Sequence, residues 1–184
     1  MSSRILGIDP GLNITGYGVL EAVDGRLRLC EAGVVRGKTR GSLTKRLAEI
    51  HAGIADVIAN LHPAVMALEE LYSHYERPRT AILMGHARGV IYLAASRREI
   101  PVIAYPASLV KRSVTGHGRA SKAQVAAMVC QALRLETAPQ PEDVTDALAL
   151  ALCHTAALRG GLTVTRRLPE QIKAALACRE GRGS

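Results

Sequence analysis

Two short apolar runs, each ending in a carboxylate, constrain this chain more than any other feature. Residues 4–9 (RILGID) run into Pro10-Gly11, and residues 64–69 (AVMALE) carry no charge before Glu69. Runs of this length bounded by turn residues are typical of β-strands, and the second has the unbroken apolar character of a strand buried on both faces. The sequence therefore predicts a sheet in which Asp9 and Glu69 each stand at a strand end.

The segments around these runs predict a mixed sheet. Residues 15–21 and 27–35 read as two strands joined by a hairpin at Asp24-Gly25, and residues 101–105 as a fifth strand. Helical spacing and capping residues predict helices over residues 43–61, 80–98, 108–114, 122–133 and 142–159. This order predicts an α/β protein with a ribonuclease H-like fold: a mixed five-stranded sheet, its first three strands antiparallel, with helices on both faces.

Two further acids, Asp143 and Asp146, lie three residues apart in the last of these helices, so their side chains share one face. Asp146 is followed by ALALALC, and an ionised carboxylate in such apolar surroundings needs a cation or strong donors. Each acid also has a simpler interpretation. Asp143 could favour the positive end of the helix, Asp9 could be a turn residue, and Glu69 could be an ordinary strand-end residue.

Four acids gathered at one site would indicate divalent cations. Mg²⁺ and Mn²⁺ prefer hard oxygen ligands, and crowded carboxylates repel one another without such ions. A pair of ions about 4 Å apart can activate water and stabilise the leaving oxygen during phosphodiester cleavage. We therefore expect metal-assisted hydrolysis with two Mg²⁺ ions, or Mn²⁺ in their place, in each site.

Basic residues are segregated along the chain, which carries a formal net charge of +8. From Arg77 to Arg134 there are ten lysines and arginines, Arg88 among them, against the single acid Glu99. Such a segment favours a surface that follows nucleic-acid phosphates, with a solvated basic face as the alternative. Its candidate phosphate contacts are Arg77, Arg79, Arg112 and Arg119.

Cysteine usage and hydropathy exclude several classes of protein. The cysteines at 30, 130, 153 and 178 include no CxxC pair, so neither a zinc site nor a disulfide framework is predicted. No uncharged apolar stretch reaches the length of about 18 residues that a membrane span needs, and the N-terminus carries no secretory signal. We expect a cytoplasmic protein with one domain over residues 1–160 and a basic C-terminal tail, residues 161–184, that contains a short helix.

Three motifs resemble the acidic motifs of the RuvC family of Holliday-junction resolvases. They are LGIDPG at 6–11, ALEELY at 67–72 and PEDVTDALALALCH at 141–154. The resemblance extends in order and spacing from about residue 4 to residue 160, and includes TGYG at 15–18 and GHARG at 85–89. It implies that the metal-binding acids are Asp9, Glu69, Asp143 and Asp146.

The same resemblance implies roles for other residues. Lys111 and Lys122 match the active-site basic residues of the family, which would hold the scissile phosphate. Tyr72 matches an aromatic residue that stacks on bases near the junction centre, and Tyr75 is a second candidate. The 80–98 helix, with small residues at 81, 85, 87, 89 and 94, resembles the helix through which family members dimerise. The resemblance also implies a homodimer that makes paired symmetric nicks across a four-way junction. Its expected partner is a branch-migration motor of the RuvA/RuvB type.

Three alternatives remain open from the sequence. An actin-like ATPase or sugar kinase is suggested by Asp-Pro-Gly followed by Thr-Gly-Tyr-Gly, but 184 residues leave little room for a second nucleotide-binding lobe. A junction-binding protein without activity would explain the basic segment but not Asp146 in an apolar helix. A related nuclease that acts on RNA is the third alternative.

Overall fold

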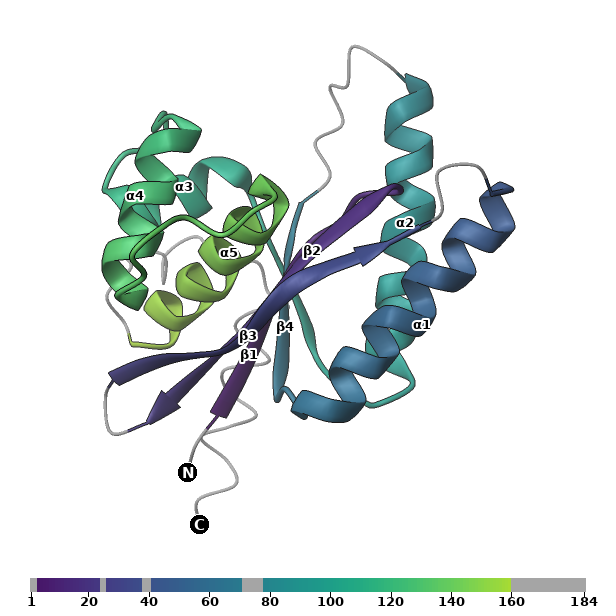
Figure 1. The fold of residues 1–184 in the computed structure, drawn as a ribbon, viewed down its shortest axis with the longest axis horizontal. Coiled ribbons are helices and arrows are strands. Elements are labelled where there is room, and N and C mark those ends of the chain that lie inside the picture. The colour runs from purple at the N-terminus through teal and green to yellow at the C-terminus, as the bar shows by residue number, and fades with distance from the viewer. Residues whose placement is uncertain (1–2, 24–25, 38–40, 71–77, 160–184) are drawn as a thin grey trace.

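The computed structural model describes residues 3–23, 26–37, 41–70 and 78–159 of the chain (Figure 1). A sheet in the order β3-β2-β1-β4-β5 crosses the molecule. Its strands are β1 (Ser3–Asp9), β2 (Ile14–Val23), β3 (Arg26–Arg36), β4 (Val65–Glu69) and β5 (Val102–Tyr105). β1 and β3 are antiparallel to β2, and β4 is parallel to both β1 and β5. The predicted mixed five-stranded sheet is confirmed.

Helices cover both faces of this sheet. α1 (Leu43–Leu61) and α2 (Pro78–Ser96) lie on one face, while α3 (Ala107–Thr115), α4 (Lys122–Leu133) and α5 (Glu142–Leu158) lie on the other (Figure 1). The predicted caps are present: the Ser42 hydroxyl accepts from Lys45 N–H, and Ser121 forms a reciprocal capping box with Gln124. Because these caps satisfy the free N–H groups of the first turn, α1 and α4 begin where the sequence predicts.

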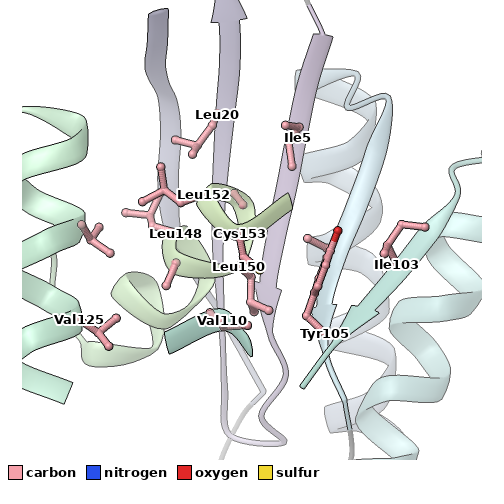
Figure 2. Close-up of a cluster of buried hydrophobic side chains, with 14 of the residues drawn as sticks. Ile5, Leu20, Ile103, Tyr105, Val110, Val125, Leu148, Leu150, Leu152 and Cys153 are labelled. Carbon is pink, nitrogen blue, oxygen red and sulfur yellow. The ribbon is translucent and has the colours of Figure 1, made fainter. Parts of the chain in front are cut away.

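Alternation along the strands divides the interior into two apolar cores. On β1, Ile5 belongs to the core under α3, α4 and α5, whereas Leu6 and Ile8 belong to the core under α1 and α2. Figure 2 shows the first core, in which Ile5 of β1 and Leu148 of α5 lie on the same side of the sheet. Side chains alternate between the faces of a strand, so both helical layers are anchored on one run of residues.

Small residues of α2 differ in their surroundings within one chain. Ala87 and Ala94 are buried in the core shared with α1. A Cβ built on Gly85 or Gly89 would meet nothing within 4 Å, so these two glycines border open space. The close helix approach expected on this helix is therefore confined to its alanines in the structure of one chain.

Two of the sequence expectations about the fold lie outside the described residues, namely the hairpin at Asp24-Gly25 and the basic tail 161–184. No helix among the described residues has both the length and the apolar character that crossing a membrane requires.

Candidate active site

Asp9 and Glu69 reach the same edge of the sheet because β1 and β4 are parallel neighbours. Ile8 and Leu68 are register partners in this strand pair, so the next residue of each strand is an acid at its carboxyl end. Apolar residues precede both acids, and their burial fixes the register that aligns the two ends. The strand ends predicted from the two apolar runs thus lie side by side.

Glycines let α5 approach this edge closely. A Cβ added to Gly7 would lie 2.0 Å from the carbonyl oxygen of Ala147, and a Cβ added to Gly16 would lie 2.0 Å from that of Asp143. Gly16 is also the register partner of Asp9. Any side chain at these positions would collide with helix backbone, which cannot swing aside. The first turns of α5, which carry Asp143 and Asp146, therefore lie directly against β1 and β2.

Most of the predicted site residues line one cavity of about 310 Å³. Its charged lining residues are Asp9, Glu69, Lys111, Lys122 and Asp146. Apolar residues of α3, α4 and α5 complete the wall, namely Ala107, Val110, Val125, Ala149 and Leu150. The cavity therefore lies between the ends of β1 and β4 and the helices α3, α4 and α5. The positions of its charged groups depend on how these five elements pack.

Asp143 lies near this cavity without lining it. It stands in the first turn of α5, half-buried, with its main chain against Gly16. Its charge nevertheless acts on Asp9, where it is one of three acids that raise the pKa. The structure therefore groups Asp143 with the other acids electrostatically, one helical turn before Asp146.

Burial and mutual repulsion hold the acids away from their ordinary titration range. Burial raises the pKa of Asp9 to about 7, and the charges of Asp146, Glu69 and Asp143 add to the effect. Burial and the charge of Asp146 also raise the pKa of Glu69, against the opposing charges of Arg88, Lys111 and Lys122. In both shifts burial is the larger cause, and the charges of neighbouring acids add to it.

Lys122 is the cation that contacts this cluster directly. Its Nζ lies 3.1 Å from Oδ2 of Asp146 and 3.3 Å from Oε2 of Glu142. The hydrogen bond to Asp146 raises the pKa of Lys122, and the bond to Glu142 adds to this shift. Lys122 is therefore charged at neutral pH and sits between one carboxylate of the cavity and one outside it.

The chemistry of the donors fits a divalent cation. Carboxylate oxygens are the ligands that Mg²⁺ and Mn²⁺ prefer, and the raised pKa of Asp9 reports negative charge that a cation would relieve. Among the described residues, no group of three His, Cys, Asp or Glu side chains is set to enclose an ion. Asp146 is held by Lys122 at 3.1 Å, so an ion bound by Asp146 would replace this contact.

Arg88 is a neighbour of the site that the sequence places wrongly. From the sequence, Arg88 is included in the basic segment expected at the surface, yet it is only 8% exposed. Its guanidinium donates to the main-chain carbonyl of Glu69 and to the Tyr92 hydroxyl, and lies over the Tyr92 ring. Its position inside the GHARG motif was the available signal, because a charged residue between small ones on a helix can face inward.

The predicted DNA contacts are only partly described. Arg79 in the first turn of α2, Arg112 on α3 and Arg119 in the loop before α4 are all exposed. Arg119 also lines a second cavity, of about 480 Å³, together with His117 and Met128. Tyr72, Tyr75 and Arg77 lie outside the described residues.

Known sequences similar to this chain share one description. The family model described as Crossover junction endodeoxyribonuclease RuvC matches residues 5–154. A protein of that name from Rhodopirellula baltica is 53% identical over 152 residues, which cover 83% of this chain and 85% of the relative. Another, from Moorella thermoacetica, is 47% identical over 150 residues, covering 82% and 89% of the two chains.

Solved structures agree with the sequence matches. T. thermophilus RuvC in complex with Holliday junction substrate aligns with a TM-score of 0.81 at 37% identity, covering 86% of this chain and 96% of that one. The yeast mitochondrial Holliday junction resolvase Ydc2 aligns with a TM-score of 0.59 at 15% identity, over 82% and 77% of the two chains. The second match shows a shared fold, while the first extends to the sequence.

Proposed function

The chain belongs to the RuvC family of crossover junction endodeoxyribonucleases, and we propose that its carboxylate cavity is where it cuts four-way DNA junctions. The observation that carries this proposal is the meeting of Asp9, Glu69 and Asp146 with Lys111 and Lys122 in one cavity. Acids in excess of cations suit divalent ions, and lysines at the rim suit a phosphate. Family membership makes the enzyme a nuclease of DNA recombination and repair, and does not favour the ATPase alternative.

We assign the metal ligands to Asp9, Glu69, Asp143 and Asp146. Mg²⁺ is the proposed ion, with Mn²⁺ as a substitute and two ions per site. Bound ions would supply Lewis acidity that activates the attacking water and offsets charge on the leaving oxygen. The protein contributes a rigid frame for its carboxylates, since two of them end buried strands and two lie on a helix packed against glycines.

The two lysines of the cavity act on the phosphate. Lys111 reaches the cavity from α3 and Lys122 from the first turn of α4. An ammonium group held here can orient the scissile phosphate and stabilise the charge that develops on its oxygens. Lys122 would leave Asp146 when the acids take up their ions, and Glu142 remains as its second partner. This exchange would make Lys122 available to the substrate in the metal-loaded state.

Substrate contacts are proposed over the exposed basic residues Arg79, Arg112 and Arg119, with Tyr72, Tyr75 and Arg77 added from the family resemblance. We propose that the enzyme works as a homodimer, because a junction with two-fold symmetry calls for two symmetry-related sites to make paired nicks. A RuvA/RuvB-type motor and a cytoplasmic location follow from the same role. Residues 1–160 would form the nuclease domain, with 161–184 as a tail.

The decisive experiment compares substrates and metal. The protein is incubated with a labelled four-way junction, a linear duplex of matched sequence and an RNA–DNA hybrid, each with Mg²⁺ or with chelator. We expect nicking of the junction that needs Mg²⁺ and leaves the duplex and the hybrid intact. Cleavage of the RNA strand would favour the RNA nuclease instead, and junction binding without cleavage at any metal concentration would favour the binding protein.

Lysine variants test the assignment to the phosphate. Lys111→Ala and Lys122→Ala should slow junction cleavage more than they weaken junction binding, since their charge acts on the reacting phosphate. Lys45→Ala, at an exposed lysine of α1, is the matched control and should change neither. Equal losses of cleavage and binding would reduce both cavity lysines to general backbone contacts.

A further inference from the structure

A buried tyrosine–histidine pair lies below the cavity and takes no part in the chemistry described so far. The Tyr105 hydroxyl oxygen and His154 Nδ1 are 2.6 Å apart, and the two rings meet edge to face with centroids 6.0 Å apart. Tyr105 is fully buried and His154 is 4% exposed. A polar contact this short and this deep is directional, and losing either partner would leave a buried polar atom unsatisfied.

Tyr105 lies on β5, the strand paired with the Glu69 strand β4, and His154 lies on α5, the helix that carries Asp146. Tyr105 ends β5, where it is the register partner of Glu69, and its carbonyl oxygen accepts from Glu70 N–H at 2.9 Å. His154 lies on α5 eight residues after Asp146, with the cavity residue Leu150 midway between them. One hydrogen bond therefore links the strand pair that presents Glu69 to the helix that presents Asp146.

The packing around α5 explains why such a link matters. Ala147 and Ala151 meet the sheet where a Cβ at Gly7 would touch their backbone, and the Leu148 side chain packs where a Cβ at Gly18 would lie, so every contact between α5 and these two glycines is apolar or with main chain. Figure 2 shows Tyr105 on β5 and Leu150 and Cys153 on α5 within the apolar cluster that surrounds this contact. Apolar packing is non-directional, so these contacts do not by themselves specify one angle of the helix against β4 and β5. A hydrogen bond with a narrow range of distance and angle opposes sliding and rotation of the helix.

We propose that Tyr105 and His154 are positioning residues that fix α5 against β4 and β5 at the separation where Asp146 and Glu69 can share one ion. The inference rests on the proposed function for its consequence in catalysis, but the positioning itself concerns the protein's own acids. Neither residue lines the cavity, so both act through the helix and the strand that carry them.

The experiment separates positioning from simple core stability. Tyr105→Phe removes the hydroxyl that lies 2.6 Å from His154 Nδ1, which should lower Tm by about 5 °C. Tyr105→Phe combined with His154→Leu replaces both partners by apolar groups and should restore most of that Tm. If the pair positions the helix, both variants cut the junction roughly 10-fold more slowly than wild type with unchanged junction affinity.

A second readout uses metal without DNA. Isothermal titration of Mg²⁺ into each full-length protein should show roughly 10-fold weaker binding for both variants, although the double variant has regained its Tm. Tyr17→Phe is the matched control, because it removes a tyrosine hydroxyl that bonds Glu31 between β2 and β3 at 2.7 Å. It should leave cleavage and Mg²⁺ binding at wild-type values.

His154→Asn provides the rescue, because its amide places a polar atom near the former Nδ1 and can bond Tyr105 again. It should bind Mg²⁺ and cut more like wild type than His154→Leu does. Recovery of cleavage and Mg²⁺ affinity together with Tm in the double variant would overturn the proposal, and so would wild-type values in Tyr105→Phe. Should wild type fail to cut junctions, the proposed function falls, while the Mg²⁺ titration still decides the positioning.

Discussion

Two acids on the β1–β2 strand pair, Glu21 and Asp9, have opposite surroundings. Glu21 is buried, and arginines of the chain lie beside it: Arg4 Nε at 3.2 Å and Arg28 Nη2 at 2.6 Å. Asp9, at the other end of β1, faces three acids, and among the cations Lys122 acts on it. Arginines of the chain thus neutralise Glu21, as expected of a structural carboxylate, whereas the charge of Asp9 is left for an ion from solution if the proposed metal site is correct.

The largest expected difference is between Asp9→Asn and Glu21→Gln. Asp9→Asn should reduce junction cleavage at least about 1,000-fold with junction affinity retained, because it removes a proposed metal ligand and little packing. Glu21→Gln should leave cleavage within about 3-fold and lower the free energy of unfolding by about 1–2 kcal/mol. Single-turnover cleavage and urea unfolding measure the two effects. A loss of cleavage in Glu21→Gln equal to that in Asp9→Asn would erase the contrast.

The close approach of α5, which brings Asp143 and Asp146 near Asp9, can be tested by substituting a glycine that permits it. In Gly16→Ala the new Cβ would meet the carbonyl of Asp143, so α5 must move; we expect cleavage roughly 100-fold slower and unfolding easier by about 2–3 kcal/mol. Gly33→Ala is the control, because its Cβ would meet the Tyr17 hydroxyl, the far end of a side chain that can shift. Cleavage by the control should match wild type, and normal cleavage by Gly16→Ala would show that the close approach is not needed.

A smaller effect on cleavage is expected when the arginine beside Glu69 is replaced than when Gly16 is replaced, and none when an arginine beside Glu21 is replaced. Arg88 is the cation that lowers the pKa of Glu69 most, and it also donates to the carbonyl of Glu69. Arg88→Met removes both interactions and should slow cleavage by about 10-fold. Arg28→Met removes a partner of Glu21 but leaves Arg4, and should not change the cleavage rate. Arg88→Lys, which retains the charge, should lie between Arg88→Met and wild type. Steady-state cleavage at saturating Mg²⁺ ranks the four proteins.

The smallest effect is in the pH dependence of stability. Asp9 has its folded pKa raised from 3.8 to about 7, so its contribution to stability is fully present below about pH 4 and is lost as pH rises through 7. In chelator, wild-type Tm should fall by a few degrees between pH 5 and pH 8 from this cause, and Asp9→Asn should flatten the decline. Saturating Mg²⁺ should raise Tm most at pH 8, where the acid is ionised. An unchanged pH profile in Asp9→Asn would contradict the assigned shift.

Local patterns made much of the fold and half of the site predictable. The strand-end acids Asp9 and Glu69 follow from apolar runs that stop at turn residues, and Ser42 and Ser121 mark their helices through side-chain chemistry within one turn. The α2 helix begins two residues earlier than predicted, at Pro78, because proline is well tolerated in a first turn. Strand ends and helix caps depend on residues that are close together in the sequence, which is why the sequence predicts them.

Features that depend on packing between distant segments could not be predicted. Gly7 and Gly16 look like ordinary strand glycines until α5 is placed on them. Arg88 was assigned to a surface because charge alone does not reveal burial, and the contact of Lys122 with Asp146 joins two helices whose relative position the sequence leaves open. These residues decide how closely the acids approach, so the chemistry was easier to predict than its geometry.

The order of the elements has a consequence for protein synthesis. The strands that carry Asp9 and Glu69 emerge early from the ribosome, whereas α5 is the last described element to be made. Until that helix is released and docks on the glycines of β1 and β2, the two early acids have no Asp146 beside them. A nascent chain that has not yet released α5 therefore carries an incomplete set of the proposed ligands, and the proposed cutting centre forms only after that helix has been translated and has docked.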